Sequence, residues 1–208
     1  MKKRAFIDLD DTLYDSSRMF DPIRTDMIAL GHSSEEVDRH GLTLSAEGYS
    51  FERHLRLLGH PADFIDRKRH EYYAVLAQGD RFLFPNVARD LRNLACTSDC
   101  HLLTYGDPAF QMYKATHISS MQRSFVRMHY VWRQQTKGDV LRSMGRHGAV
   151  WFLDNDSGHL LDAHKKAPWV RPVRMCWPET NQRPHEGDGS LWPVVTSFSE
   201  FVQLVEVA

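Results

Sequence analysis

A short apolar stretch that ends in acid, close to the start of the chain, is the feature that most constrains the fold. Residues 5–7 are Ala-Phe-Ile, and the stretch then breaks into Asp8, Asp10 and Asp11. A short apolar run of this kind predicts a fully buried strand. Open α/β sheets bind ligands outside the carboxyl ends of their strands. Three carboxylates crowded at such an end repel one another, so the stretch indicates a divalent cation with oxygen ligands.

The segments after residue 80 alternate between strand-like and helix-like patterns. We predict strands at 101–104, 125–131, 149–153 and 170–176, and helices at 87–94, 109–116, 137–144, around 160–166 and 197–205. A polar loop rich in Pro and Gly is predicted over 177–194. Strands that alternate with helices indicate βαβ units and a parallel sheet. The expected fold class is α/β, a Rossmann-like parallel sheet with helices on both faces.

The stretch between the first strand and this alternating part shows helical spacing and no strand signal. Ser16 or Ser17 can cap a first helix, residues 41–50 suggest a break, and a longer helix is predicted over 62–78. We therefore expect a small all-helical insertion at 15–80. The α/β core would then consist of residues 1–14 and 81–208.

Composition sets few limits beyond those of an ordinary globular protein. The 208 residues are 42% hydrophobic and 25% charged with a formal net charge of -1, so bulk charge indicates neither a nucleic-acid nor a membrane partner. No apolar run approaches the roughly 20 residues of a membrane span. Three cysteines argue against a disulfide framework. We expect a cytoplasmic monomer or homodimer without a signal peptide.

Four polar clusters fall at predicted strand ends or helix starts and could converge on one edge of the sheet: Asp8 with Asp10, Thr104, Lys137 and Asp154. A carboxylate can attack phosphorus, and a second one two residues later can move the protons. A hydroxyl and an ammonium can hold the phosphoryl oxygens. A further carboxylate would complete a Mg²⁺ site, which offsets the repulsion between the nucleophile and the phosphate.

These residues resemble the motifs of the haloacid dehalogenase-like (HAD-like) hydrolase superfamily. The four matching stretches are Asp8-Leu9-Asp10-Asp11-Thr12, Leu102-Leu103-Thr104-Tyr105-Gly106-Asp107, Thr136-Lys137-Gly138-Asp139 and Trp151-Phe152-Leu153-Asp154-Asn155-Asp156. Each motif alone is weak, but the four occur in the family's order. The helical insertion at 15–80 resembles the family's α-helical cap. The resemblance implies a phosphatase-type member that acts on a small-molecule phosphate ester.

The resemblance also implies a role for each matched residue. Asp8 would be the nucleophile and Asp10 the general acid/base. Thr104 and Lys137 would bind the phosphoryl group together with the adjacent Tyr105 and Gly106. Magnesium would be held by Asp8, by the backbone carbonyl of Asp10 and by Asp154. Dehalogenases of this superfamily lack the second aspartate, so Asp10 favours phosphoryl transfer over carbon–halogen cleavage.

Several assignments stay open at the level of sequence. Asn155 or Asp156 could support the metal through water, and Asp156 could instead cap the next helix. Asp11 is interpreted as a solvated or loop-capping residue. Lys114 is the rival of Lys137 for the phosphoryl group, and we favour Lys137 because it lies one helix before the strand that ends in Asp154.

Two alternatives concern the protein as a whole. The arginines of the insertion could meet a second anionic group on the substrate or lie on a solvated helix face: Arg18, Arg24, Arg53 and Arg56. The alternative to an enzyme is a non-catalytic HAD-like protein that binds a phosphorylated ligand or a protein partner. Loss of Asp8 or Asp10 would favour that alternative, and both are present.

Overall fold

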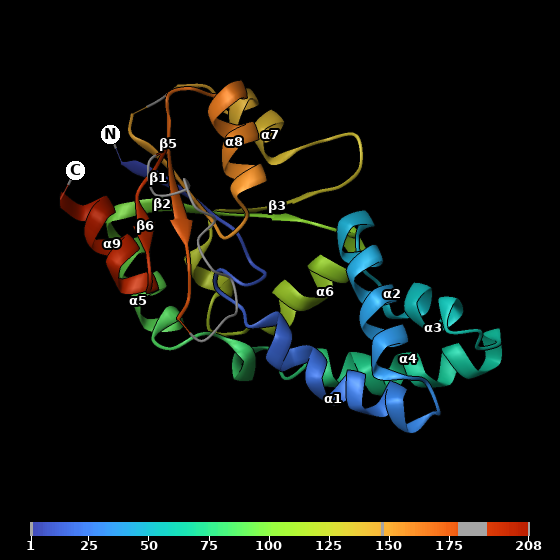
Figure 1. Cartoon of the computed structure of the whole chain (residues 1–208). Helices are drawn as coiled ribbons and strands as arrows, with labels where there is room; N and C mark the ends of the chain where they lie inside the picture. The colour runs from blue at the N-terminus through green and yellow to red at the C-terminus, as the bar shows by residue number, and fades with distance from the viewer. Residues whose placement is uncertain (1, 147, 179–190, 208) are drawn as a thin grey trace.

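The computed structural model describes residues 2–146, 148–178 and 191–207, and within them the strands form one parallel sheet in the order β3-β2-β1-β4-β5-β6. The strands are β1 (Lys3–Ile7), β2 (Ser98–Tyr105), β3 (Arg127–Val131), β4 (Val150–Asp154), β5 (Val170–Met175) and β6 (Val194–Val195). The predicted α/β class with a Rossmann-like parallel sheet is confirmed (Figure 1).

Helices account for the rest of the regular structure in these ranges. Four α-helices follow the first strand: α1 (Ser16–Ala29), α2 (Ser34–Glu47), α3 (Phe51–Leu57) and α4 (Ala62–Leu76). The others alternate with the strands: α5 (Val87–Thr97), α6 (Pro108–His117), α7 (Lys137–Ser143), α8 (Ser157–Lys166) and α9 (Phe198–Val207). Two 3₁₀ turns, η1 (Gly79–Phe82) and η2 (Gln122–Ser124), lie in the connections.

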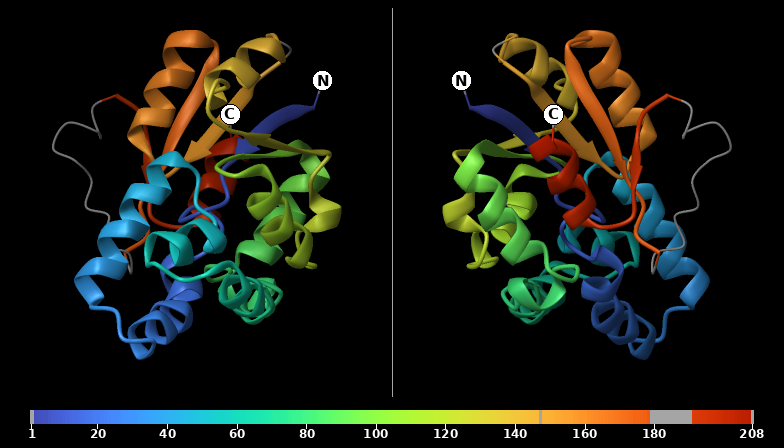
Figure 2. Two further views of the ribbon diagram at one scale, coloured as in Figure 1. Left: turned by 90° about the vertical axis from the view of Figure 1, so that its right-hand side faces the viewer. Right: turned by 90° about the vertical axis from the view of Figure 1, so that its left-hand side faces the viewer.

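Both faces of the sheet are buried, as the apolar strand sequences require. Successive side chains of a strand point to opposite faces, and β1 shows the consequence. Phe6 lies in one buried cluster with side chains of α7 and α8, whereas Ala5 and Ile7 lie in the other cluster with side chains of α5 and α9. Figure 2 shows these helix pairs on opposite sides of the sheet. Every side chain of β1 from Ala5 to Ile7 is therefore in the core.

The helices α1 to α4 are grouped on one side of the sheet (Figure 1). Aromatic side chains join them to α6. The Phe51 ring meets the Phe110 ring edge-on with centroids 5.1 Å apart, and Tyr49 meets the same ring at 5.5 Å. The helical character predicted for residues 15–80 is thus observed. Their independence as a cap domain stays a prediction.

One sequence-based boundary is wrong, because α2 continues through the predicted break at 41–50 as far as Glu47. Val37 and Leu44 are both buried on this helix, so packing extends it past Gly41. Gly41 itself faces the His54 ring of α3, where a Cβ would lie 3.7 Å from the ring. The helix stops at Gly48, whose φ of 90° disfavours other residues.

Two further details differ from the sequence-based expectations. The first helix is capped by Asp15, whose carboxylate accepts a hydrogen bond from the Arg18 N–H, and not by Ser16 or Ser17. The short strand β6 falls at the end of the predicted loop and pairs with β5. Residues 179–190 of that loop lie outside the described ranges.

The described residues bear on two expectations, the absence of a membrane span and the absence of a disulfide framework. None of the helices in these ranges is long and apolar enough to cross a membrane. The three cysteines are free thiols, and Cys100 and Cys176 are buried.

Truncation of the aromatic junction between the helical insertion and α6 tests its contribution to stability. Phe51→Ala removes a fully buried ring, so the free energy of unfolding should fall by about 3–5 kcal/mol. Leu57→Ala on the same helix is the control, because Leu57 is 49% exposed and should change stability by less than about 0.5 kcal/mol. Urea unfolding followed by circular dichroism measures both. Equal effects would contradict the packing described here.

Candidate active site

The strand register brings the first and fourth acidic motifs side by side. Ile7 of β1 is aligned with Leu153 of β4, so Asp8 and Asp154 each follow at the same level. The backbone N–H of Asp8 donates to the Leu153 carbonyl at 3.0 Å, which extends the pairing by one residue. The strands β2 and β3 lie on one side of β1, and β4, β5 and β6 lie on the other, so the strand order switches at β1. Ligand sites of open α/β sheets usually lie at such a switch point.

Lys137 connects these two carboxylates. Its Nζ donates to Asp8 Oδ1 at 2.6 Å and to Asp154 Oδ2 at 2.7 Å, and all three side chains are at most 5% exposed. Lys137 is the first residue of α7, and Thr136 and Asp139 form a capping box there that fixes where the helix begins. The structure thus places the predicted lysine directly against the predicted nucleophile.

The charges in this cluster do not balance, because one ammonium faces two carboxylates. Burial raises the pKa of Asp8, Lys137 lowers it and Asp154 raises it further, with a net result of about 7. Burial alone would raise the pKa of Asp154, but Lys137 and His159 outweigh it and lower that pKa to about 2. The cluster therefore favours additional positive charge next to Asp8.

The loop after Asp154 distinguishes between the two interpretations of Asp156. Asp156 Oδ1 accepts from the N–H groups of Gly158 and His159, at 2.6 and 3.2 Å, so its side chain caps α8. Its own backbone N–H donates to Asp154 Oδ1 at 2.9 Å and helps to orient that carboxylate. The capping interpretation is the one observed. Asn155 accepts from the Thr12 hydroxyl at 3.3 Å.

Asp10 is held by a set of side chains that is separate from the set around Asp8. Lys114 Nζ lies 2.6 Å from Oδ2 and also contacts Oδ1, Gln111 Nε2 donates to Oδ2 at 2.8 Å, and the Ser16 hydroxyl donates to Oδ1 at 2.8 Å. Burial would raise the pKa of Asp10, but Lys114, Gln111 and Ser16 lower it overall. Asp10 is therefore an anion at neutral pH in this arrangement.

Gly106 makes room for one of these contacts. The Gln111 side chain crosses over Gly106 to reach Asp10, and it also donates to the Tyr105 carbonyl at 3.0 Å. A Cβ on Gly106 would lie 2.7 Å from Gln111 Nε2, and the φ of Gly106 is 141°. Only glycine fits this close approach without strain.

Thr104 lies at the carboxyl end of β2 but is fully buried. Its hydroxyl has no hydrogen-bond partner among the described residues, which is costly for a buried polar group. Such a hydroxyl is available to a ligand that reaches it. Thr104 and Asp154 do not line the cavity described below, whereas Tyr105 and Gly106 do.

Asp11 has the loop-capping role expected from the sequence. Its Oδ1 accepts from the Ser16 N–H at 3.2 Å. The residue has a φ of 56°, where the chain turns from Asp10 towards α1. Burial raises the pKa of Asp11 to about 6, and the neighbouring Asp10 adds to this effect.

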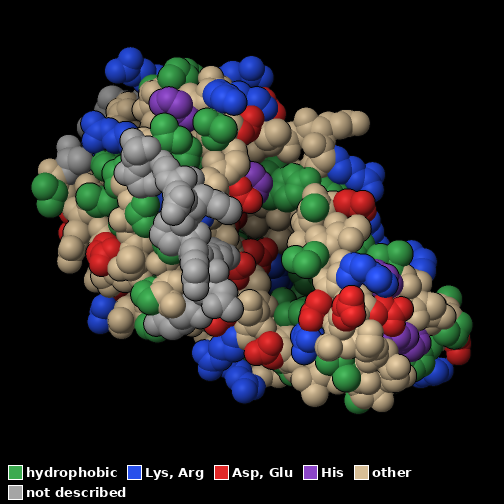
Figure 3. Space-filling model, in the orientation of Figure 1, with side chains coloured by type: hydrophobic (Ala, Val, Ile, Leu, Met, Phe, Trp, Pro, Cys, Tyr) green, Lys and Arg blue, Asp and Glu red, His purple; other side chains and the backbone are tan. Residues whose placement is uncertain are grey.

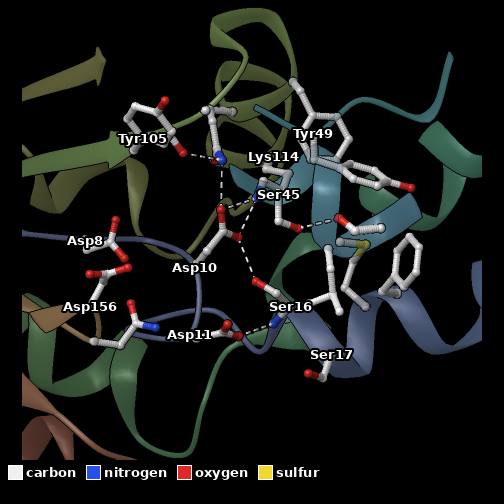
Figure 4. Close-up of a pocket in the computed structure, with 18 of the residues that line it drawn as sticks. Asp8, Asp10, Asp11, Ser16, Ser17, Ser45, Tyr49, Tyr105, Lys114 and Asp156 are labelled. Atoms are coloured by element: carbon white, nitrogen blue, oxygen red, sulfur yellow. Dashed lines mark hydrogen bonds and ion pairs between the residues drawn. The ribbon is translucent and has the colours of Figure 1, made fainter. Parts of the chain in front are cut away.

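A cavity of about 610 Å³ lies between these residues and the helices α1 and α2. In Figure 3 the molecule is hollowed between its two parts, with acidic side chains on one side of the hollow and hydrophobic ones on the other. Figure 4 shows Asp10 with Lys114 and Ser16, with Asp8 and Asp156 on one side and Tyr49 on the other. Asp8, Asp10 and Lys137 thus border one space large enough for a small molecule.

The side chains beside Asp8 fit a divalent cation in charge and in atom type, but they supply few ligands. Two buried carboxylates share one ammonium, and hard cations prefer carboxylate and carbonyl oxygens. The described residues include no group of three or more His, Cys, Asp or Glu side chains that could hold a metal ion. The predicted set offers only two carboxylates, Asp8 and Asp154, and depends on the Asp10 backbone carbonyl and on water for the remaining positions.

Sequence reasoning did not identify every residue at this site. His159 lies on α8 with Nδ1 3.5 Å from Asp154 Oδ2, and the carboxylate raises the pKa of His159 although burial opposes this. The sequence indicates Ser16 only as a helix cap. Gln111 lies three residues before Lys114, the predicted rival of Lys137 for the phosphoryl group, and this spacing puts both on one helix face. Their target could not be identified because Asp10 is about a hundred residues away.

The fold and the site together define an α/β protein with an acidic cluster where the central parallel strand ends. No family model matches the sequence, and no curated protein is similar to it in sequence. Solved structures are similar in fold. A Burkholderia xenovorans protein described as a haloacid dehalogenase-like hydrolase is 17% identical, with 98% of this chain and 96% of that chain covered and a TM-score of 0.75.

Two other structures extend this comparison. The HAD-hydrolase YfnB of Bacillus subtilis, bound to magnesium, is 12% identical with a TM-score of 0.67, and 98% of each chain is covered. The L-2-haloacid dehalogenase of Xanthobacter autotrophicus is 16% identical with a TM-score of 0.61, covering 99% of this chain and 98% of that one. The chain has the fold of the haloacid dehalogenase-like hydrolases, as the four motifs predict.

Removal of the Lys114 ammonium tests how Asp10 is held. Lys114→Met should lower the free energy of unfolding by about 3 kcal/mol at pH 7, because it leaves a largely buried carboxylate without its cation. The pKa of Asp10 is lowered from 3.8, so its stabilising effect is complete above that value and is lost as the pH falls through the lowered pKa. The difference between wild type and variant should therefore shrink below pH 4.

Lys165→Met is the matched control, because Lys165 is exposed on α8. Denaturant unfolding at a series of pH values compares the three proteins. A wild-type advantage over Lys114→Met that is the same at pH 3 and pH 7 would contradict the ion pair with Asp10.

Proposed function

We propose that this protein is a magnesium-dependent hydrolase that cleaves a small-molecule phosphomonoester through an aspartyl-phosphate on Asp8. The observation that carries the proposal is the position of Asp8. It is buried at the end of the central strand, is bonded to Lys137 beside Asp154, and lines the same cavity as Asp10. The likeness in fold to HAD-like hydrolases supports a hydrolase of this type.

In the first half of the reaction, an Asp8 carboxylate oxygen attacks phosphorus. A new oxygen–phosphorus bond forms, and the bond from phosphorus to the leaving alcohol breaks. The Lys137 ammonium would stabilise negative charge next to the attacking oxygen. The Thr104 hydroxyl has no partner among the described residues, but it would reach a phosphoryl oxygen only if the buried end of β2 opened to the cavity. Asp10 supplies a proton to the leaving oxygen. Asp10 must take up a proton before this step, because its contacts with Lys114, Gln111 and Ser16 favour the carboxylate form.

In the second half, a water molecule attacks the phosphorus of the aspartyl-phosphate. Asp10 accepts the proton of that water as a base, and the Asp8 carboxylate is released with inorganic phosphate. The contacts of Asp10 with Lys114, Gln111 and Ser16 favour its carboxylate form, which is the form this half requires. The same contacts fix the direction in which the carboxylate points.

Asp8, Asp154 and the Asp10 backbone carbonyl would hold magnesium in this proposal. When bound, it would neutralise the repulsion between the nucleophile and the phosphate dianion. The structure of the magnesium-bound YfnB has the same fold, which supports this assignment. The excess negative charge around Lys137 supports it independently.

Cleavage of carbon–halogen bonds is the second candidate, because similar folds include an L-2-haloacid dehalogenase. The observation that speaks against it is Asp10. Its side chain faces the cavity and is held there by three partners, as expected of a group that moves protons during phosphoryl transfer. Assays for halide release from 2-chloropropionate and for phosphate release from an aryl phosphate separate the two activities.

Replacement of the nucleophile gives the sharpest test of the proposal. The wild type should hydrolyse 4-nitrophenyl phosphate with magnesium and lose this activity in excess chelator. Asp8→Asn should reduce turnover to background, because the amide cannot form the aspartyl-phosphate. Asp99→Asn is the control and should keep wild-type rates, because Asp99 lies near the amino end of β2, away from the carboxyl ends of the strands. Wild-type turnover by Asp8→Asn, or turnover without metal, would contradict the mechanism.

A further inference from the structure

The half of the cavity that lies opposite the catalytic carboxylates comes from α1, α2 and Tyr49, which lies two residues after the end of α2. Its apolar lining residues there are Met19, Phe20, Leu42 and Tyr49, joined from α6 by Phe110. The small or polar lining residues of α1 and α2 are Ser16, Ser17, Gly41 and Ser45, and Asp38 is the single charged residue of these helices among the described residues that line the cavity. This wall therefore offers apolar and aromatic surface for the part of a substrate that is not phosphate.

The cavity has no uncommitted cation among the described residues that line it. Lys137 is shared by Asp8 and Asp154, Lys114 is paired with Asp10, and His159 lies near Asp154. These cations lie on the core side, where the phosphoryl group would bind. A second anion on the substrate would have to compete with a carboxylate for any of them.

The arginines of the helical insertion do not provide such a cation either. Arg24 donates to both oxygens of Asp38, at 2.6 and 2.7 Å, which neutralises the one carboxylate of this wall. Arg53 donates to the Gly48 carbonyl at 2.6 Å and to Glu47 at 2.5 Å. Arg18 and Arg56 do not line the cavity. The sequence allows these arginines either to meet a second anionic group of the substrate or to lie on a solvated helix face. The structure favours a role outside the substrate site.

From this distribution we infer that the substrate is a phosphomonoester of an alcohol with an aromatic or otherwise apolar body and no second anionic group. This inference rests on the proposed function. The apolar wall would bury the alcohol, and unpaired negative charge placed against it would lose its hydration without gaining a partner. Substrates with two anionic ends, such as bisphosphates and phosphorylated hydroxy acids, would be disfavoured.

The test compares two esters that differ by one charge, phenyl phosphate and 4-carboxyphenyl phosphate. The wild type should show a kcat/KM for phenyl phosphate that is at least about fivefold higher, since the added carboxylate meets no free cation among the described residues that line the cavity. Leu42→Lys places an ammonium on the apolar wall at a side chain that is 75% exposed, so folding should be preserved. This variant should raise the relative kcat/KM for the carboxylated ester about fivefold.

Leu57→Lys is the matched control, because Leu57 is also exposed on the helical insertion but does not line the cavity. It should leave the ratio of the two kcat/KM values unchanged. Comparison of ratios between proteins cancels the different chemical reactivity of the two esters. A wild-type preference for the carboxylated ester, or an equal ratio in Leu42→Lys and wild type, would overturn the inference.

Binding measurements separate this inference from the proposed function. The Kd values of both esters for Asp8→Asn, measured by calorimetry with magnesium present, report discrimination without turnover. Weaker binding of the carboxylated ester supports the exclusion of a second anionic group even if the wild type hydrolyses neither compound, a result that would refute the phosphatase activity and with it the assignment of these esters as substrates. Equal or tighter binding of the carboxylated ester overturns the inference even if the wild type is an active phosphatase.

Discussion

The site depends on one buried ammonium group between two carboxylates. Lys137 bonds Asp8 and Asp154 in a region where each side chain is at most 5% exposed. An isolated buried charge is very costly, so removal of Lys137 would leave both carboxylates uncompensated. The same cluster is one positive charge short of neutrality. The same arrangement therefore has two consequences. The fold needs Lys137 to compensate the buried carboxylates, and the remaining negative charge favours binding of a divalent cation.

A second ion pair serves a different residue of the same motif. Asp8 and Asp10 are two positions apart, yet their side chains diverge and find separate lysines, Lys137 from α7 and Lys114 from α6. The separation gives the two carboxylates opposite environments. The pKa of Asp8 is raised and that of Asp10 is lowered. The first half of the proposed reaction needs the opposite protonation states, an ionised Asp8 and a protonated Asp10, so positive charge bound beside Asp8 would have to lower the pKa of the nucleophile.

The sequence predicted that Asp8 and Asp154 lie at one edge of the sheet, and the structure places them there because strand direction constrains it. Asp8 and Asp154 both end apolar runs, and the register of parallel strands must then place them at one edge. Prediction was weaker where a contact between distant elements decides the outcome. The break expected at Gly41 is absent because Val37 and Leu44 are buried on one face of α2, and the sequence alone does not show what covers that face.

The sequence by itself determined the parallel α/β class, the helical nature of residues 15–80 and the identity of the acidic residues at the strand ends. Local periodicity and turn chemistry suffice for these features. Only the tertiary structure decided the pairing of Lys114 with Asp10, the capping role of Asp156 and the apolar character of the cavity wall. The pairing and the wall depend on packing between elements that are far apart in the chain. The cap depends on the direction of the Asp156 side chain, which the sequence alone does not give. The opposed walls of the cavity, acidic on the core and apolar on α1 and α2, are the clearest product of that packing.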